Sequence, residues 1–240
     1  MRICQRTFNF IFLFSVAFTE NSISQDSSKW VIGIHGGAAA AAFYDVPATN
    51  NDYQLTPGFI AGVVGQYEIG GKISICAEVN FEMKGNSIIV HSSNPYVYSP
   101  RNIKIRTNLD YITLPLTCRY THSSRKLKYY IQLGPYIGYL LSVRNYVGQA
   151  GETLSPTGEV DMGYYRQIDY GLTAGIGLAI PLSKKFQLPI EIRNNLSIHR
   201  LYSAEASSDN SSKNESFALV VGLQYLFQPT KKAGSNLSRP

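Results

Sequence analysis

The chain has 240 residues and a formal net charge of +6, with 44% hydrophobic but only 16% charged residues. This length allows one or two domains with a substantial core, and the composition excludes intrinsic disorder. Few charges together with 17 Tyr and 20 Gly favour β structure. No window has the roughly 18 consecutive apolar residues of a transmembrane helix, and this observation does not exclude a transmembrane β-barrel.

The first 25 residues have the pattern of a secretory signal peptide. Arg2 and Arg6 precede an apolar run at 8–18, and a polar stretch follows at 21–25. The run fits a signal peptide better than a membrane span of about 20 residues, and a buried N-terminal strand is the alternative. We expect a signal peptide at 1–25, a folded domain at 26–227 and a flexible C-terminal tail at 228–240.

Beyond the signal segment, Lys and Arg are scattered through turns instead of forming a stripe, so we expect no nucleic-acid partner. Cys76 and Cys118 fall on opposite phases of their expected strands. Their side chains should point apart, which predicts two free thiols.

From Trp30 onward, apolar residues recur at every second position, which is typical of β-strands. The clearest case is 73–84, where Ile, Ala, Val, Phe and Met alternate with Ser, Cys, Glu, Asn and Lys. The pattern predicts eight strands, at 30–40, 57–67, 73–84, 108–121, 128–143, 169–182, 188–202 and 216–227.

Short and long connections alternate between these strands. The short ones are 70–71, 123–127 and 183–187, and the long polar ones are 41–56, 85–107, 144–168 and 204–215. An up-and-down meander places all long loops at one end and all tight turns at the other. We therefore predict an all-β fold, an eight-stranded antiparallel up-and-down barrel.

Two features of the strands predict that the apolar face points outward into a membrane, unlike that of a soluble lipocalin-like carrier. The polar face carries many glycines, which suit a crowded lumen. Aromatic residues near the strand ends resemble two interfacial girdles. They are Trp30, Tyr67, Tyr120, Tyr129 and Phe227 at the tight-turn end and Phe81, Tyr139, Tyr170, Phe217 and Tyr202 at the loop end.

Three motifs carry a resemblance to a known family. DYITLPLTCRY at 110–120, GPYIGYLL at 134–141 and DYGLTAGIG at 169–177 resemble the small outer-membrane β-barrel domain proteins of Bacteroidota, described as PorT-like or porin family. The resemblance implies a transmembrane β-barrel in the outer membrane of a Gram-negative bacterium. It implies no particular activity, because that family has no uniform one.

Charged residues on the polar phase are the main candidates for a site. Isolated charges in a narrow lumen are costly, so we expect an ion-paired plug that fixes strand register. The alternative is a charged constriction in a small pore, although an eight-stranded interior is only just wide enough for its own side chains. The residues of this lumen charge network are Glu78, Glu82, Arg119, Glu191 and Arg193.

A catalytic site is the weaker alternative. Ser197 and His199 share a face of one strand, and His35 and Glu191 supply a further base and carboxylate. No glycine-flanked nucleophile turn surrounds the serine, and the four histidines lack metal-ligand spacing. We expect no enzyme activity, no cofactor and no metal.

Basic and aromatic residues gather where the fourth strand meets its loop, and they suit the phosphates of lipopolysaccharide; a solvated loop edge is the alternative. These residues are Tyr96, Tyr98, Arg101, Lys104 and Arg106. We expect a monomer in contact with outer-membrane lipid that acts through its long loops as a surface interaction or secretion-accessory component, with an envelope protein as partner. The alternatives are a narrow pore for small solutes and a soluble periplasmic carrier.

Overall fold

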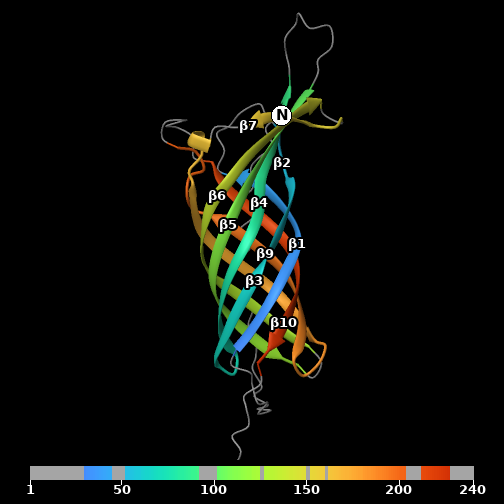
Figure 1. Ribbon diagram of the computed structural model, residues 1–240, viewed down its shortest axis with the longest axis vertical. Coiled ribbons are helices and arrows are strands. Elements are labelled where there is room, and N and C mark those ends of the chain that lie inside the picture. The colour runs from blue at the N-terminus through green and yellow to red at the C-terminus, as the bar shows by residue number, and fades with distance from the viewer. Residues whose placement is uncertain are drawn as a thin grey trace, which may run out of the picture.

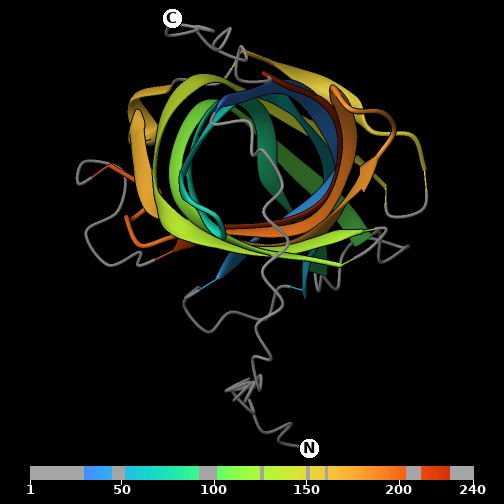
Figure 2. The same ribbon diagram turned by 90° about the horizontal axis from the view of Figure 1, so that it is seen from below.

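In the computed structural model, eight long antiparallel strands close into a barrel (Figures 1 and 2). The structure describes residues 30–44, 52–91, 102–124, 127–149, 152–159, 162–203 and 212–227, so the expected signal peptide and C-terminal tail lie outside the described residues. The long strands are β1 (Trp30–Tyr44), β3 (Thr56–Gly70), β4 (Ile73–His91), β5 (Asn102–Ser123), β6 (Lys128–Gln149), β8 (Ile168–Pro181), β9 (Phe186–Ser197) and β10 (Lys213–Leu226). The short elements are β2 (Asp52–Gln54), β7 (Ser155–Glu159) and the 3-10 helix η1 (Met162–Tyr164).

Each long strand pairs with its neighbours along the chain, and β1 pairs with β10 to close the ring. The described chain begins and ends at the tight-turn end, where the Phe227 amide donates to the Trp30 carbonyl at 3.0 Å. The predicted up-and-down barrel is therefore confirmed. In the described ranges no helix is long and apolar enough to span a membrane.

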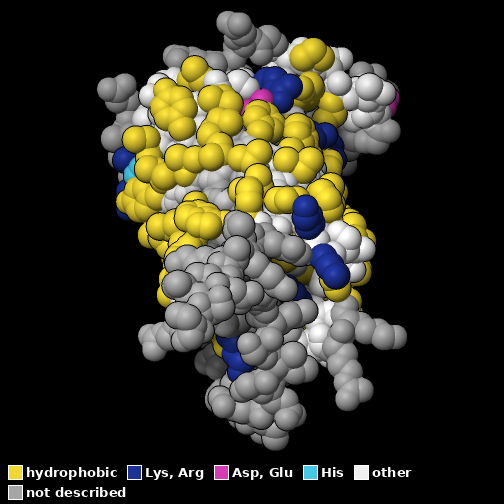
Figure 3. Space-filling view, turned by 60° about the horizontal axis from the view of Figure 1, so that its bottom comes forward, with side chains coloured by type: hydrophobic (Ala, Val, Ile, Leu, Met, Phe, Trp, Pro, Cys, Tyr) yellow, Lys and Arg dark blue, Asp and Glu magenta, His cyan; other side chains and the backbone are white. Residues whose placement is uncertain are grey.

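The apolar face of the barrel points outward, as predicted. Ile131, Ile176 and Ile192 lie side by side on β6, β8 and β9, and each is more than half exposed. Figure 3 shows hydrophobic side chains covering the visible wall. A soluble lipocalin-like carrier would place this face inside, so that alternative is wrong. The two cysteine side chains point apart, as predicted, because Cys76 is buried and Cys118 is exposed.

Glycine serves two different needs in this barrel. Gly71 has φ of +36° in the tight turn between β3 and β4, a conformation that side chains disfavour. Gly175 faces the lumen, where a Cβ atom would lie 2.6 Å from Oε1 of Glu191. The first glycine closes a hairpin, and the second makes room for a lumen carboxylate.

Three strands continue at least six residues beyond the ends that the sequence predicts. Because β4 reaches His91, β5 begins at Asn102 and β6 reaches Gln149, the expected loops 85–107 and 144–168 are partly strand. These extensions contain Ile and Val, which favour extended backbone, and Ile88, Ile105 and Val147 pair across them.

A β-bulge corrects the predicted alternation on β6. Asp110 pairs with Ser142, whereas Tyr111 pairs with Leu140, so Leu141 is an extra residue. The bulge reverses the faces of the residues that follow. Ser142, expected in the lumen, instead donates to Asp110 on the outer wall, while Val143 is buried in the mouth of the barrel.

β9 is shorter than predicted, because it ends at Ser197 and not at Tyr202. Leu201 is buried in an apolar cluster, and the Tyr202 ring packs against Tyr165 with centroids 5.4 Å apart. Tyr202 therefore does not belong to the outer aromatic girdle. Trp30, Tyr67, Tyr139 and Tyr170 do have exposed rings on the outer wall.

An arginine on the outer wall tests this orientation. We expect Ile176→Arg, in the middle of β8, to lower the free energy of unfolding in lipid vesicles by about 2–4 kcal/mol, because it places a charge in hydrocarbon. Leu182→Arg, beside the tight turn, is the control and should cost at most about 1 kcal/mol. Denaturant titration followed by Trp30 fluorescence measures both. Equal losses for the two variants contradict the prediction.

Candidate functional site: the charged lumen

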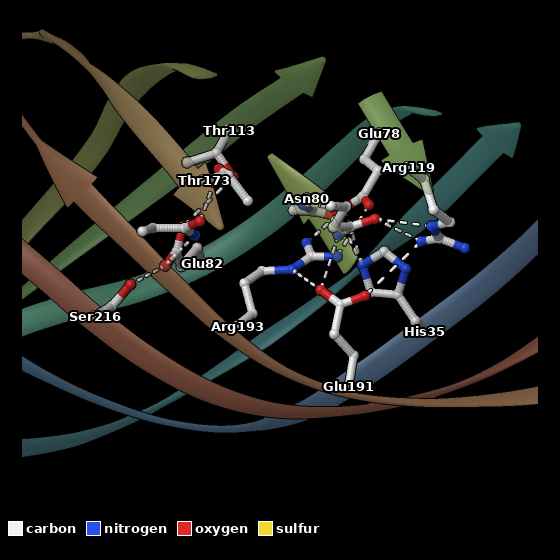
Figure 4. Close-up of polar contacts among 12 residues, drawn as sticks. His35, Glu78, Asn80, Glu82, Thr113, Arg119, Thr173, Glu191, Arg193 and Ser216 are labelled. Carbon is white, nitrogen blue, oxygen red and sulfur yellow. Dashed lines mark hydrogen bonds and ion pairs between the residues drawn. The ribbon is translucent and has the colours of Figure 1, made fainter. Parts of the chain in front are cut away.

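The five charged residues predicted for the lumen all lie inside the barrel and are at most 4% exposed. β4 contributes Glu78 and Glu82, β5 contributes Arg119, and β9 contributes Glu191 and Arg193. Within each strand they lie at even spacing, so successive side chains enter the lumen at different heights. The structure joins four of them in one network and places Glu82 in a second one (Figure 4).

Arg193 is the centre of the first network. Its Nη1 and Nη2 atoms lie 2.5 and 2.9 Å from the two carboxylate oxygens of Glu78, and its Nε donates to Glu191 at 2.7 Å. This bidentate pair joins β9 to β4 across the lumen. Charge-assisted bonds of this geometry are among the strongest that proteins form. The Arg193 guanidinium therefore binds two carboxylates and links two strands that are not neighbours in the ring.

Arg119 extends the network toward the tight-turn end. Its guanidinium donates to Gln132 Oε1 at 2.7 and 3.0 Å and to Gln66 Oε1 at 3.0 Å, and it lies 3.7 Å from Glu191. It also lies 4.1 Å from the centre of the Tyr130 ring. Two neutral amides and an aromatic ring thus supply most of the contacts of Arg119, and they stabilise its buried charge.

Glu82 belongs to a second network, above the first. Asn195 and Ser216 donate to its carboxylate at 3.0 and 2.5 Å, and Lys84 Nζ lies 3.8 Å away. No contact with Arg119 or Arg193 is found for Glu82 among the described residues. The sequence pattern predicted that Glu82 faces the lumen, but it did not predict that the lumen charges form two separate networks.

Lys84 and Asp169 are buried charged residues that the sequence-based site leaves out. Lys84 Nζ lies 3.1 Å from Asp169 Oδ2 and donates to Tyr136 Oη at 3.1 Å, while Ser197 also donates to Asp169. Both residues occupy lumen-facing positions in the alternation of their strands, so the alternation could have identified them. Lys84 closes the predicted strand 73–84, and Asp169 opens the strand predicted at 169–182.

An apolar cluster lies above both charged networks, in the mouth of the barrel. It consists of Phe43, Leu109, Tyr111, Leu140, Val143 and Leu201, with Tyr165 and Tyr202 packed against it. The alternation predicts a polar lumen throughout, so it misses this layer. Its members come from β1, β5, β6 and the segment after β9, and only the closed ring brings them together.

The hypothetical serine site does not assemble in the described residues. The Ser197 hydroxyl donates to Asp169 and accepts a hydrogen bond from the His199 backbone amide, and the residue is fully buried. The His199 ring instead contacts the Ile168 carbonyl and Arg166, and His35 lies beside Asn80. Neither histidine ring contacts the serine. The described residues also contain no cluster of side chains suited to a metal ion.

A small cavity remains in the middle of the lumen. Among the residues that line it are His35, Glu78, Arg119, Glu191 and Arg193. It is surrounded by the first charged network, whose side chains fill the space around it (Figure 4). The cavity is therefore part of the plug.

The basic residues predicted at the rim are only partly described. Lys104 and Arg106 lie on β5, not in a loop, because this strand begins at Asn102. Both side chains are half-buried. Tyr96, Tyr98 and Arg101 lie outside the described residues.

The comparisons with known proteins agree with this barrel. A family model described as "Outer membrane protein beta-barrel domain" matches residues 21–203. The chain belongs to this family. Together with the apolar outer wall, this membership places the protein in the outer membrane of a Gram-negative bacterium. No curated protein matches the chain significantly.

Solved outer-membrane barrels are similar to the chain at low sequence identity. Neisserial surface protein A has 17% identity and a TM-score of 0.42, with 82% of this chain and 97% of that chain covered. OprG from Pseudomonas aeruginosa has 12% identity and a TM-score of 0.47, with coverage of 85% and 98%. Ail, the attachment invasion locus protein of Yersinia pestis, has 13% identity and a TM-score of 0.38, with coverage of 83% and 99%.

Removing the central arginine tests the lumen network. We expect Arg193→Met to lower the free energy of unfolding by about 3–5 kcal/mol, because Glu78 is left buried without its cation. The double variant Arg193→Met with Glu78→Leu should recover most of this loss, since both charges are gone and Glu191 keeps Arg119.

Chemical denaturation measures both variants in detergent or lipid. Lys185→Gln, an exposed residue in the turn between β8 and β9, is the control and should change stability by at most about 0.5 kcal/mol. If Arg193→Met is as stable as this control, the lumen network does not stabilise the barrel.

Proposed function

We propose that this outer-membrane barrel is a non-enzymatic, non-conducting surface protein that binds an envelope protein through its loop end. The observation that carries the proposal is a filled barrel from which three strands continue outward. Figure 1 shows β4, β5 and β6 rising above the other strands, with β7 at the same end. The plug argues against transport, and the extended strands supply a surface for interaction.

The lumen is occupied at three successive levels. The first network contains Arg193 and Arg119, the second contains Lys84, and the apolar cluster lies above them. An eight-stranded barrel is only just wide enough for its own side chains, so these residues leave little room for a solute. This packing supports a plug and gives no support to a narrow pore.

The surface that extends from the barrel is a small sheet, which we call the projecting sheet. It comprises residues 85–91 of β4, 102–109 of β5 and 143–149 of β6, together with β2 and β7. Ile88, Ile105 and Val147 form one row across its inner face. A rigid barrel that carries a partly apolar sheet beyond the membrane matches the arrangement in which binding surfaces are found.

Two short strands form the edges of the projecting sheet. β2 pairs with β4 at 87–89, and β7 pairs with β6 between Arg144 and Val147. β7 also contains the exposed Pro156, which cannot donate to a further strand. A partner would therefore bind a face of the sheet, because short edge strands and a proline disfavour strand addition.

Two further parts of the proposal rest on separate observations. The closed ring has no free barrel edge, which supports a monomer. The motifs at 110–120, 134–141 and 169–177 support membership of the PorT-like branch. The buried Ser197 and its separation from the His199 ring support the absence of enzyme activity.

Conductance measurements test the plug. We expect the refolded protein in planar bilayers to give no sustained current, because charged and apolar side chains fill the lumen. Folding is checked beforehand by the gel shift that intact barrels show on heating, and detergent without protein is the blank. Reproducible unitary current steps from the unmodified protein would establish the pore instead.

Shortening the projecting sheet tests the interaction. Asn86 and Thr107 are directly paired, so residues 87–106 can be replaced by Asn-Gly as a two-residue hairpin turn. We expect this variant to keep its barrel and to lose a protein that cross-links to the native form in the cell envelope. Lys184→Gln with Lys185→Gln, at the opposite end, is the control and should keep the cross-link. A shortened variant that cross-links normally contradicts the proposal.

A further inference from the structure

Three basic residues on neighbouring strands share the outer wall near the loop end. They are Lys104 and Arg106 on β5 and Arg144 on β6, and we call them the basic rim patch. Arg106 pairs with Tyr146, two residues beyond Arg144, which places Arg144 on the same face as Arg106. The bulge at Leu141 is essential to this arrangement. Without the extra residue, Arg144 would face the lumen.

Contacts on the outer wall hold two of these cations in place. Arg144 Nη2 lies 2.6 Å from Asp110 Oδ2, to which Ser142 also donates, and the Arg144 side chain is still 49% exposed. Asp110 faces outward because it pairs with Met83, whose neighbours Glu82 and Lys84 both enter the lumen. The carboxylate thus orients Arg144 and leaves part of the guanidinium open.

Arg106 is fixed in a similar way. Its Nε donates to Asn108 Oδ1 at 3.0 Å, and its Nη2 donates to the Pro57 carbonyl at 2.7 Å. Lys104 forms no hydrogen bond or ion pair with a described residue. The patch therefore combines two oriented guanidinium groups with one ammonium group that has no partner among the described residues. Its three positive charges face the carboxylate of Asp110, and the strand register also pairs Arg144 with Glu159 of β7.

The height of the patch along the barrel suggests what it meets. Arg144 lies three residues beyond Leu141, which is exposed on the hydrophobic wall, so it is about 10 Å further along the strand. Tyr139 and Tyr170, also exposed, mark the upper aromatic girdle just below. Figure 3 shows basic side chains at the upper border of the hydrophobic surface. Because aromatic girdles lie at the level of the lipid headgroups, we expect the phosphate groups of outer-leaflet lipids beside Arg144.

We propose that the basic rim patch binds the phosphorylated headgroup of an outer-leaflet glycolipid. Arginine matches phosphate oxygens through its planar fork, and lysine adds a mobile point charge. The residues point to the lipid side of the wall and away from the mouth, which favours a lipid headgroup over a solute that enters the barrel. This site lies outside the lumen, on the outer face of the projecting sheet, and it leaves the inner face with Ile88, Ile105 and Val147 to the proposed protein partner.

The test measures binding of purified bisphosphorylated lipid A to the full-length protein in detergent, with dephosphorylated lipid A alongside. Each basic residue near a membrane surface contributes about 1 kcal/mol, so Lys104→Gln and Arg144→Gln should each weaken binding about fivefold. Lys104→Arg should retain binding. Lys185→Gln removes the same charge at the tight-turn end and should leave the affinity unchanged. The heating gel shift verifies that every variant is folded.

Three results would overturn the proposal. Equal affinity for the dephosphorylated lipid would show that phosphate is not recognised. Unchanged affinity in both Lys104→Gln and Arg144→Gln would place the lipid elsewhere. Displacement of lipid A by an equal concentration of inorganic phosphate would show a site for free phosphate and not for a lipid headgroup.

Discussion

Closure of eight strands into one ring is the constraint on which the rest of this molecule depends. Closure gives every long strand a hydrogen-bonded neighbour on both sides, which a lipid environment requires because it offers the backbone no other partners. It also confines every second side chain to a space only just wide enough to hold it. Whatever polar residues the strands carry inward must then satisfy one another.

The charged networks are the consequence of that confinement. Among the described lumen residues, the carboxylates Glu78, Glu82, Asp169 and Glu191 face the cations Lys84, Arg119 and Arg193. Because cations are fewer, Lys84 and Arg193 each serve two carboxylates, and amide and hydroxyl groups supply the remaining bonds. Arg193 and Glu78 come from strands that are not neighbours in the ring. Their bidentate pair therefore favours one register of the whole barrel over shifted alternatives, in which buried charges would lose their partners.

The loop end differs from the charged lumen, because its side chains lie outside the confined part of the barrel. An apolar cluster covers the lumen there, and three strands continue as a sheet outside the ring. The bulge at Leu141 connects these features, since it turns Val143 toward the cluster and Arg144 toward the outer wall. One inserted residue thus gives the same short segment an inward apolar role and an outward charged role.

The sequence by itself determined the class of fold, the eight long strands, the direction of the apolar face and the five charged residues of the lumen. The strands and their two faces follow from a period of two residues, which is a local property of an extended chain. The up-and-down order follows from the alternating loop lengths, and the direction of the apolar face follows from the glycines and the aromatic residues near the strand ends. Only the tertiary structure decided which charges pair, because Arg193 and Glu78 meet across the ring and Glu82 lies at another level. It alone also revealed the bulge at Leu141, the apolar cluster and the extensions of β4, β5 and β6. These depend on which strands lie side by side, and the alternation within one strand contains no information about its neighbour.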